Sequence, residues 1–209
     1  MIRGMCITYE YDGALYINIT NRCTNNCDFC IRNNADGAYG TDTLWLVREP
    51  TVDEVVKEIL DRNPLSYREL VFCGYGEPTV RLFELREIAM QVKERHPEVK
   101  VRVNTNGHSD LILGIPTAPL FAGAVDSVSI SLNASSPSRY NEICHPVYDD
   151  AFNAIINFAK SVSSYVPDVA FSVVRETLTD DELLACELIA EEAGVRLRVR
   201  DYIGKDEEK

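Results

Sequence analysis

Strand-like and helix-like patterns alternate along almost the whole chain, and this alternation limits the fold to a small group of α/β architectures. The strand-like runs are 14–20, 69–73, 99–104, 125–133, 169–175 and 195–203, and apolar residues at helical spacing separate most of them. Strands that alternate with helices are parallel and are joined by right-handed crossovers. Eight such units close a barrel, so the six seen here predict a partial (β/α)6 TIM-like barrel, spanning 14–204, that is open on one side.

Local signals mark where several of these elements begin. Asp12-Gly13 separates two alternating runs and predicts a tight hairpin, which adds an N-terminal strand before the first barrel strand. Thr51 with Glu54, and Thr179 with Glu182, have the spacing of capping boxes at helix starts. Residues 31–50 are rich in Gly and Asn and are expected to be mostly loop, and the charged tail 205–209 is expected to be frayed.

Composition excludes several classes of protein. The 209 residues, 45% of them hydrophobic, are enough for one α/β domain over 1–209. A net charge of -12 argues against a broad nucleic-acid surface, and no apolar run reaches membrane-spanning length. Seven cysteines, four of them scattered, and the absence of a secretory pattern at the start predict a reducing, cytoplasmic location.

Cys23, Cys27 and Cys30 stand in the run CTNNCDFC, directly after the first barrel strand. Three thiolates on one short loop can hold three irons of a 4Fe-4S cluster and leave the fourth open to a small-molecule ligand. A structural zinc site is the alternative, but such a site needs a fourth Cys or His. No His lies near the run, and the nearest one downstream is His96. The incomplete ligand set therefore favours a catalytic iron–sulfur cluster.

The run resembles the cluster loop of radical S-adenosylmethionine (SAM) enzymes, whose partial barrel also carries this loop after its first strand. The resemblance implies that SAM chelates the open iron and is reductively cleaved to a 5'-deoxyadenosyl radical, which abstracts hydrogen from a substrate. It also implies an electron donor such as flavodoxin or ferredoxin. The aromatic Phe29 precedes the last cysteine and is a candidate cofactor contact.

Other strand ends also match the family. Cys73-Gly74-Tyr75-Gly76-Glu77-Pro78 resembles the loop that receives the SAM amino group, with Tyr75 in place of a glycine. Asn104 begins NTNG, and Ser131 and Asn133 lie in SISLNA, where the family contacts SAM. Arg175 closes the fifth strand and could bind the SAM carboxylate. Ordinary turn formation explains such residues equally well when each is taken alone.

Over its whole length the chain is similar to radical SAM proteins linked to TatD-type hydrolases, through CIRNN, GYGEPT, NTNG and the late RVR. This resemblance implies a TatD-like metal-dependent hydrolase as a partner but supplies no substrate, which could be a small molecule or a peptide. A glycyl-radical activase is a further alternative, as is a noncatalytic zinc or iron–sulfur module that partners the hydrolase. The dispersed cysteines Cys6, Cys73, Cys144 and Cys186 are read as apolar core residues, and the role of Cys144-His145 is open.

Strand periodicity predicts a polar, cationic lumen. In VKVRVN and VRLRVR the valines and the leucine alternate with polar residues, and the helices must cover the apolar set on the outer face. We therefore expect Arg102 and Arg198 to form structural ion pairs inside, with Glu69 as a candidate partner low in the barrel, and Arg200 to contact an anionic substrate or the cofactor. Three further candidates for the substrate site are Tyr16, Asn18 and Tyr202. An exposed edge is the alternative for the last strand.

Overall fold

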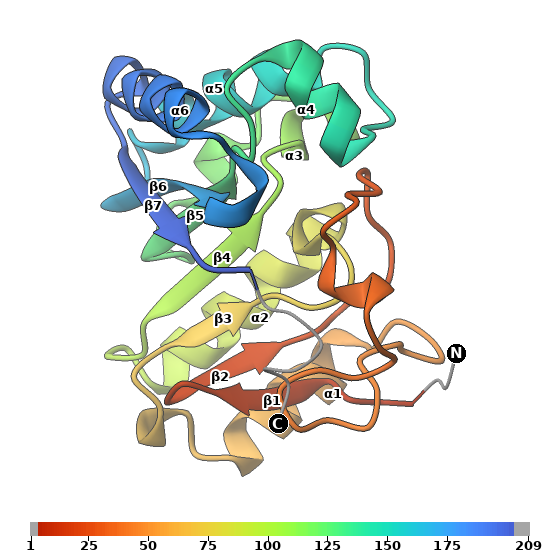
Figure 1. Ribbon diagram of the computed structural model, residues 1–209. Coiled ribbons are helices and arrows are strands. Elements are labelled where there is room, and N and C mark those ends of the chain that lie inside the picture. The colour runs from red at the N-terminus through yellow and green to blue at the C-terminus, as the bar shows by residue number, and fades with distance from the viewer. Residues whose placement is uncertain (1–3, 203–209) are drawn as a thin grey trace.

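The computed structural model describes residues 4–202. Within them a seven-stranded sheet runs in chain order from β1 to β7 (Figure 1). β1 pairs antiparallel with β2, whereas the pairs from β2–β3 to β6–β7 are all parallel. The strands are β1 (Thr8–Tyr11), β2 (Ala14–Ile17), β3 (Leu70–Phe72), β4 (Val101–Thr105), β5 (Ser127–Ser131), β6 (Asp168–Val174) and β7 (Arg196–Arg200). Because β1 and β7 end the order, the sheet stays open, which confirms the predicted partial barrel.

Helices connect the strands and cover one face of the sheet (Figure 1). They are α1 (Val52–Asp61), α2 (Leu82–Arg95), α3 (Ser109–Leu113), α4 (Pro137–Cys144), α5 (Ala151–Val162) and α6 (Asp180–Ala193). Short 3-10 turns are η1 (Ile31–Asn33), η2 (Pro64–Ser66), η3 (Pro78–Arg81), η4 (Ala118–Phe121) and η5 (Arg175–Thr177). No helix within residues 4–202 combines the length and apolar character needed to cross a bilayer.

The local signals in the sequence are confirmed. Asp12 and Gly13 both have positive φ, 49° and 70°, and turn β1 back onto β2. Both capping boxes form, with Thr51 opening α1 and Thr179 opening α6. Residues 31–50 contain one 3-10 turn and are otherwise loop, as expected. The tail 205–209 lies outside the described residues.

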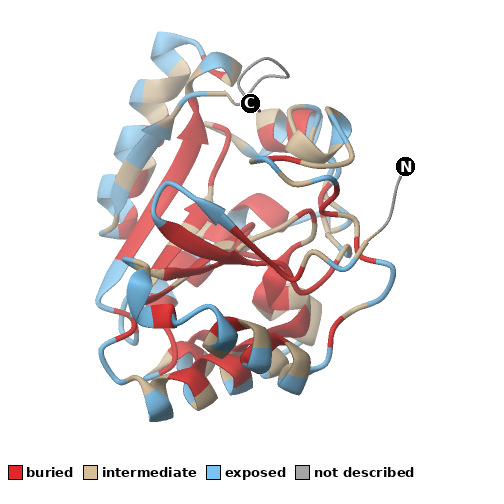
Figure 2. Cartoon of the chain, turned by 90° about the horizontal axis from the view of Figure 1, so that it is seen from below, coloured by how far each residue is buried: buried red, intermediate tan, exposed pale blue. Residues whose placement is uncertain are grey.

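The main core lies between the sheet and its helices. Figure 2 shows buried strands and helices that expose mainly their outward sides. Val101 and Val103 of β4 are buried in this core, as the alternation predicts, and they meet Phe72 of β3 and Ile130 of β5 there. Burial of this apolar layer is what fixes the register of the parallel strands.

The inner face is polar only in part, so the prediction of a polar, cationic lumen is wrong for β1 to β3. Tyr9, Tyr16 and Val71 form a second buried cluster there. Ala38 and Leu44 from the 31–50 insert complete it. A periodicity argument cannot detect this packing, because the apolar partners come from a loop with no regular pattern.

The arginines of the inner face divide into three cases. Arg102 donates to both carboxylate oxygens of Glu69 at 3.1 Å, which confirms that predicted pair. Arg198 is exposed on β7 and has no ion pair among residues 4–202, so its predicted structural pairing is wrong. β7 is an edge strand, and water solvates this charge. Arg200 is half-buried and also has no ion pair with any described residue.

Candidate active site around the cysteine loop

The cysteine loop (residues 23–30) follows β2 at the carboxyl edge of the parallel sheet. Cys23, Cys27 and Cys30 are each half-buried. Cys27 and Phe29 pack against the main core. Barrel enzymes place their reacting groups at this edge, so the loop stands where catalytic chemistry is expected.

Backbone hydrogen bonds hold the loop against the end of α4, and Figure 1 shows the orange-red chain after β2 rising beside that helix. The bonds run from Asn26 N to Cys144 O, from Asp28 N to Ile143 O and from Val147 N to Thr24 O, each at 3.0 Å. His145 Nε2 also lies 2.8 Å from the Asp28 carboxylate. Cys144 and His145 therefore support the cysteine loop from α4.

The thiols of the loop favour their protonated forms. Burial raises the pKa of Cys23 to about 12, and the nearby Glu77 carboxylate adds to the rise. A hydrogen-bond contact with Cys144, together with burial, raises the pKa of Cys27 far above its usual range. Within residues 4–202 no three His, Cys, Asp or Glu side chains are arranged to hold a metal ion. Binding of a metal to these thiols would release their protons.

The glycines of the GYGEP loop (residues 74–78) allow it to touch the chain that leads into the cysteine loop. A Cβ on Gly74 would lie 2.1 Å from Asn18 Oδ1, and one on Gly76 would lie 2.3 Å from the Thr20 carbonyl oxygen. Neither position has room for a side chain. Glu77 N donates to Arg22 O at 2.8 Å, which joins the GYGEP loop to the residue just before the cysteine loop.

Tyr75 turns its ring into the 31–50 insert. The ring is buried, and its hydroxyl donates to the Ala35 carbonyl at 2.9 Å. Trp45 packs edge-on against it, with ring centroids 5.1 Å apart. The side chain at this position thus anchors the insert, and a contact with SAM from Tyr75 stays a prediction.

Glu77 is a buried carboxylate that binds four donors of its own chain. Oε1 accepts from Thr79 N at 2.9 Å and from the hydroxyls of Thr79 and Thr105 at 2.7 Å. Oε2 accepts from Asn106 N at 2.6 Å. Burial raises the pKa of Glu77, and these hydrogen bonds oppose the rise. The residue ties the end of β3 to the end of β4, and its predicted contact with the SAM amino group stays a prediction.

Three predicted cofactor contacts lie at the ends of β4 and β5. Asn104 accepts a hydrogen bond from Arg102 at 3.2 Å. Ser131 is half-buried at the last position of β5. Asn133 is buried with a φ of 60°, donates to Cys144 Sγ at 3.6 Å and leaves Oδ1 without a partner. A buried carbonyl without a donor suits a bound ligand.

Arg175 pairs within its own turn, and its predicted contact with the SAM carboxylate stays a prediction. Its guanidinium donates to Leu178 O at 2.8 Å and pairs with Asp180 at the start of α6. These contacts stabilise the turn before α6 and occupy the group that we expected to bind the SAM carboxylate. The turn supplies an acceptor and a carboxylate close to Arg175 in sequence, and local pairing prevails.

The candidates for the substrate site lie in different surroundings. Asn18 donates to Cys6 O at 3.2 Å and to Leu44 O at 2.8 Å, so it holds the insert in place. Tyr16 is buried beside Arg102 on the inner face. Arg200 lies close enough to Cys30 and Cys73 for its charge to oppose the rise in their thiol pKa values that burial causes. It is the candidate with a free charge beside the cysteine loop.

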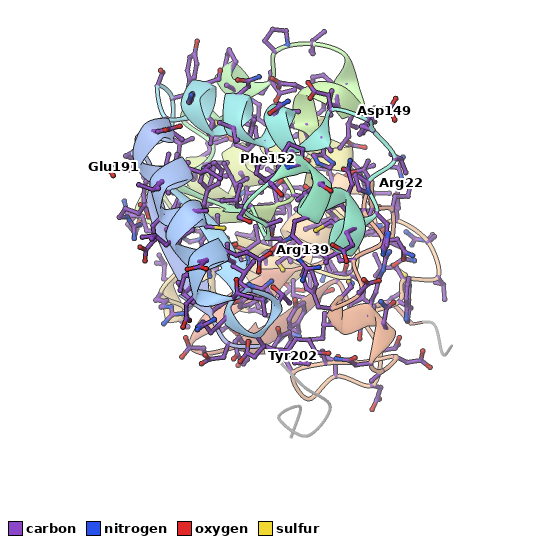
Figure 3. All side chains as sticks on the ribbon, turned by 45° about the horizontal axis from the view of Figure 1, so that its top comes forward. Arg22, Arg139, Asp149, Phe152, Glu191 and Tyr202 are labelled. Carbon is purple, nitrogen blue, oxygen red and sulfur yellow. The ribbon has the colours of Figure 1, made fainter. Side chains whose placement is uncertain are left out.

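Tyr202 joins the segment after β7 to the 31–50 insert. Its N–H donates to Glu176 at 2.7 Å, and its hydroxyl lies 3.2 Å from Asn34 Nδ2. Asn34 follows the cysteine loop, whereas Tyr202 follows β7, and Figure 3 labels Tyr202 at the edge of the molecule. The predicted substrate contact from Tyr202 remains a prediction.

Sequence reasoning missed several polar residues beneath the cysteine loop. Asn106, His108 and Tyr140 are buried there and bond to Thr24 and Asn25. The signals were faint: Asn106 lies inside NTNG, and His108 follows it directly. Nothing in the sequence near Tyr140 pointed to the loop.

Comparison with known proteins identifies the family of this chain. A family model described as the radical SAM superfamily matches residues 17–187. The chain belongs to the radical SAM superfamily. The match begins in β2 and ends in α6, so it includes the cysteine loop and the GYGEP and NTNG elements.

Curated radical SAM relatives are similar at low identity. GTP 3',8-cyclase of Paenarthrobacter nicotinovorans is 25% identical over 191 residues, which are 91% of this chain and 51% of that protein. Molybdenum cofactor biosynthesis protein 1 of Drosophila melanogaster is 27% identical over 175 residues, 84% of this chain and 28% of that protein. The chain thus spans about half or less of the length of these relatives.

Solved radical SAM structures share the fold. TYW1 with a lysine-pyruvate adduct bound has a TM-score of 0.64 at 16% identity, covering 91% of this chain and 65% of that one. Streptococcus suis SuiB bound to precursor peptide SuiA has a TM-score of 0.66 at 16% identity, covering 94% and 40%. At 16% identity, this similarity shows that the fold is shared and no more.

Radical SAM enzymes use a 4Fe-4S cluster and SAM, and a SAM-bound structure of SuiB is among the similar folds. The residues present here fit both groups. One short loop supplies three thiols and no fourth protein ligand. The unpartnered carbonyls of Asn25 and Asn133 are buried acceptors, one in the cysteine loop and one at the end of β5.

Proposed function

We propose that Cys23, Cys27 and Cys30 hold a 4Fe-4S cluster and that the protein reductively cleaves SAM to methionine and a 5'-deoxyadenosyl radical. When bound, the cluster supplies the electron for that cleavage. The observation that carries the proposal is the meeting of the cysteine loop with the GYGEP and NTNG loops through Arg22, Glu77 and Asn106. A structural metal needs no such arrangement of three strand ends.

The test is anaerobic reconstitution with iron and sulfide, followed by reduction and measurement of 5'-deoxyadenosine. The wild-type protein should turn brown and form this product. Cys27→Ala should abolish its formation, whereas Cys6→Ala, which changes a half-buried thiol outside the loop, should retain it. Full activity in Cys27→Ala contradicts the proposal, and a colourless reconstituted protein that contains zinc supports the noncatalytic alternative.

We further propose that the substrate is small and anionic. The support is Arg200, a half-buried cation without an ion pair among residues 4–202, whose charge acts on Cys30 and Cys73. An unpaired cation in a partly dry site favours a carboxylate or phosphate partner. The named activity of the GTP 3',8-cyclases also concerns an anionic molecule.

The substrate proposal can be tested on extracts from cells that lack the gene. A small-molecule fraction retained on an anion exchanger should increase 5'-deoxyadenosine formation. When the extract is labelled with deuterium, deuterium should appear in the 5'-deoxyadenosine. Arg200→Gln should lose this stimulation but keep the slow cleavage of SAM alone. Stimulation confined to the neutral or cationic fractions contradicts the proposal.

The partners follow from the same proposal. Radical SAM homologues need an electron donor, and we propose flavodoxin or ferredoxin for this role. The CIRNN, GYGEPT and NTNG runs support membership of the TatD-linked group and hence a TatD-like hydrolase as a partner. The cysteine pattern, three in one loop and four dispersed, supports a reducing cytoplasm. Co-purification with a tagged TatD-like protein from the same cells tests the partnership.

A further inference from the structure

A buried network of hydrogen bonds lies beneath the cysteine loop, and the proposed chemistry does not use it. Asn106 Nδ2 donates to Thr24 Oγ1 at 2.8 Å, and this hydroxyl lies 2.9 Å from His108 Nδ1. The other ring nitrogen of His108 lies 3.2 Å from the Tyr140 hydroxyl, which accepts from Asn25 Nδ2 at 2.7 Å. The network thus begins and ends on two neighbouring residues of the loop, Thr24 and Asn25.

The network is neutral, and either tautomer of His108 can complete it. His108 and Tyr140 are both fully buried. Burial lowers the pKa of His108 to about 4 and raises the pKa of Tyr140. A neutral imidazole has one donor and one acceptor nitrogen, so His108 can bond to both hydroxyls at once. An ionised residue here would leave a buried charge without a partner.

Asn25 and Asn106 each place an N–H donor near the same predicted cluster ligand, Cys23. Asn25 N lies 3.5 Å from Cys23 Sγ, and Asn106 Nδ2 lies 4.0 Å from the same sulfur. Asn106 is itself held by Glu77, which accepts from its backbone N–H at 2.6 Å. Hydrogen bonds to ligand sulfurs are one of the means by which a protein sets the reduction potential of an iron–sulfur cluster.

We propose that Asn106, His108 and Tyr140 are positioning residues that hold Thr24 and Asn25, and thereby fix the N–H donors at Cys23. The effect of these residues on a cluster rests on the proposed function. Their effect on the position of the cysteine loop applies to the cluster-free protein as well. His108 and Tyr140 act through the cysteine loop, whereas Asn106 also approaches Cys23 directly.

The first test uses cluster-free protein and measures the rate at which iodoacetamide labels each cysteine, read by mass spectrometry. Tyr140→Phe keeps the ring and removes the hydroxyl, so labelling of Cys23 should accelerate about fivefold, the population change expected for the loss of one hydrogen bond. Asn106→Ala should act in the same direction. Cys186, a buried residue of α6, is the internal reference for general opening. Acceleration of Cys23 no greater than that of Cys186 in both variants overturns the proposal.

The second test measures the midpoint potential and the electron paramagnetic resonance spectrum of the reduced cluster. Weaker N–H bonds to sulfur make the added electron less stable, so both variants should have a more negative potential. Tyr9→Phe is the matched control, because it removes another buried tyrosine hydroxyl bond, to the Cys73 carbonyl, away from the cysteine loop. Potentials of Tyr140→Phe and Asn106→Ala equal to that of wild type overturn the inference. Failure of the wild type to form a cluster instead overturns the proposed function, while the labelling test still decides the network.

Discussion

Glu77 shows how one residue of a family motif can also be essential to the fold. Its carboxylate accepts four hydrogen bonds in a buried site. Glu77→Gln replaces one oxygen by a donor that faces donors, so we expect the free energy of unfolding to fall by about 1–3 kcal/mol. Urea denaturation measures this, with Glu187→Gln on the exposed side of α6 as the control. Equal stability of the two variants contradicts the expectation.

His108 should make the stability of the protein depend on pH. Its pKa is about 4 in the folded protein because burial disfavours the imidazolium, whereas an exposed histidine has a pKa near 6.5. The unfolded chain therefore binds more protons between these values, and stability should fall as the pH drops from about 6.5 to 4. Urea denaturation from pH 7 to pH 4 should show a smaller decrease in His108→Asn than in wild type. Parallel curves would contradict this assignment.

Local sequence patterns suggest the candidate cluster ligands and cofactor contacts, but not the residues that support them. Cys23, Cys27 and Cys30 share one short run, and Gly76 and Glu77 share another, so local spacing reveals them. The supporting contacts join residues 82 and 115 positions apart, Thr24 with Asn106 and Asn25 with Tyr140. Contacts between residues this far apart in the sequence leave no local pattern in the sequence.

At the level of single elements, the helix starts offer a clear test. The Thr179 hydroxyl accepts from Glu182 N at 3.2 Å, and the Glu182 carboxylate accepts from Thr179 N at 2.8 Å. Thr179→Ala removes the first bond and should lower the free energy of unfolding by about 1 kcal/mol. Thermal unfolding measures the loss against Ser164→Ala, an exposed position. A loss in the control as large as in Thr179→Ala would refute the expectation.

Strands and long helices were predictable because each repeats a short pattern. The alternation of Val101 and Val103 with Arg102 correctly predicted which side chains of β4 lie on its outer face. α3 and α4 were missed, because α3 has only 5 residues and α4 only 8, too few to show an apolar period. The pairing of Arg175 with Asp180 was missed for another reason, since sequence does not tell which acceptor an arginine will choose.

For the whole molecule, the insert acts as part of the core. Leu44 is buried against Tyr16 and Val71 on the inner face of the sheet. Leu44→Ala should therefore lower the free energy of unfolding by about 2–5 kcal/mol. Val47→Ala, in the same insert but exposed, should change it by less than about 0.5 kcal/mol. Similar urea midpoints for the two variants would show that the insert is only a surface loop.

The long separation between the cysteine loop and its supports also bears on the order of events during synthesis. When the ribosome has made the first strands, Cys23 and its neighbours exist, but Asn106, His108 and Tyr140 do not. Until about two thirds of the chain has emerged, the thiols lie on an unsupported segment that oxidants can reach. The loop acquires its anchors only after α4 forms. Under the proposed function, loading of iron and sulfide therefore follows the folding of strands β1 to β5 and of α4.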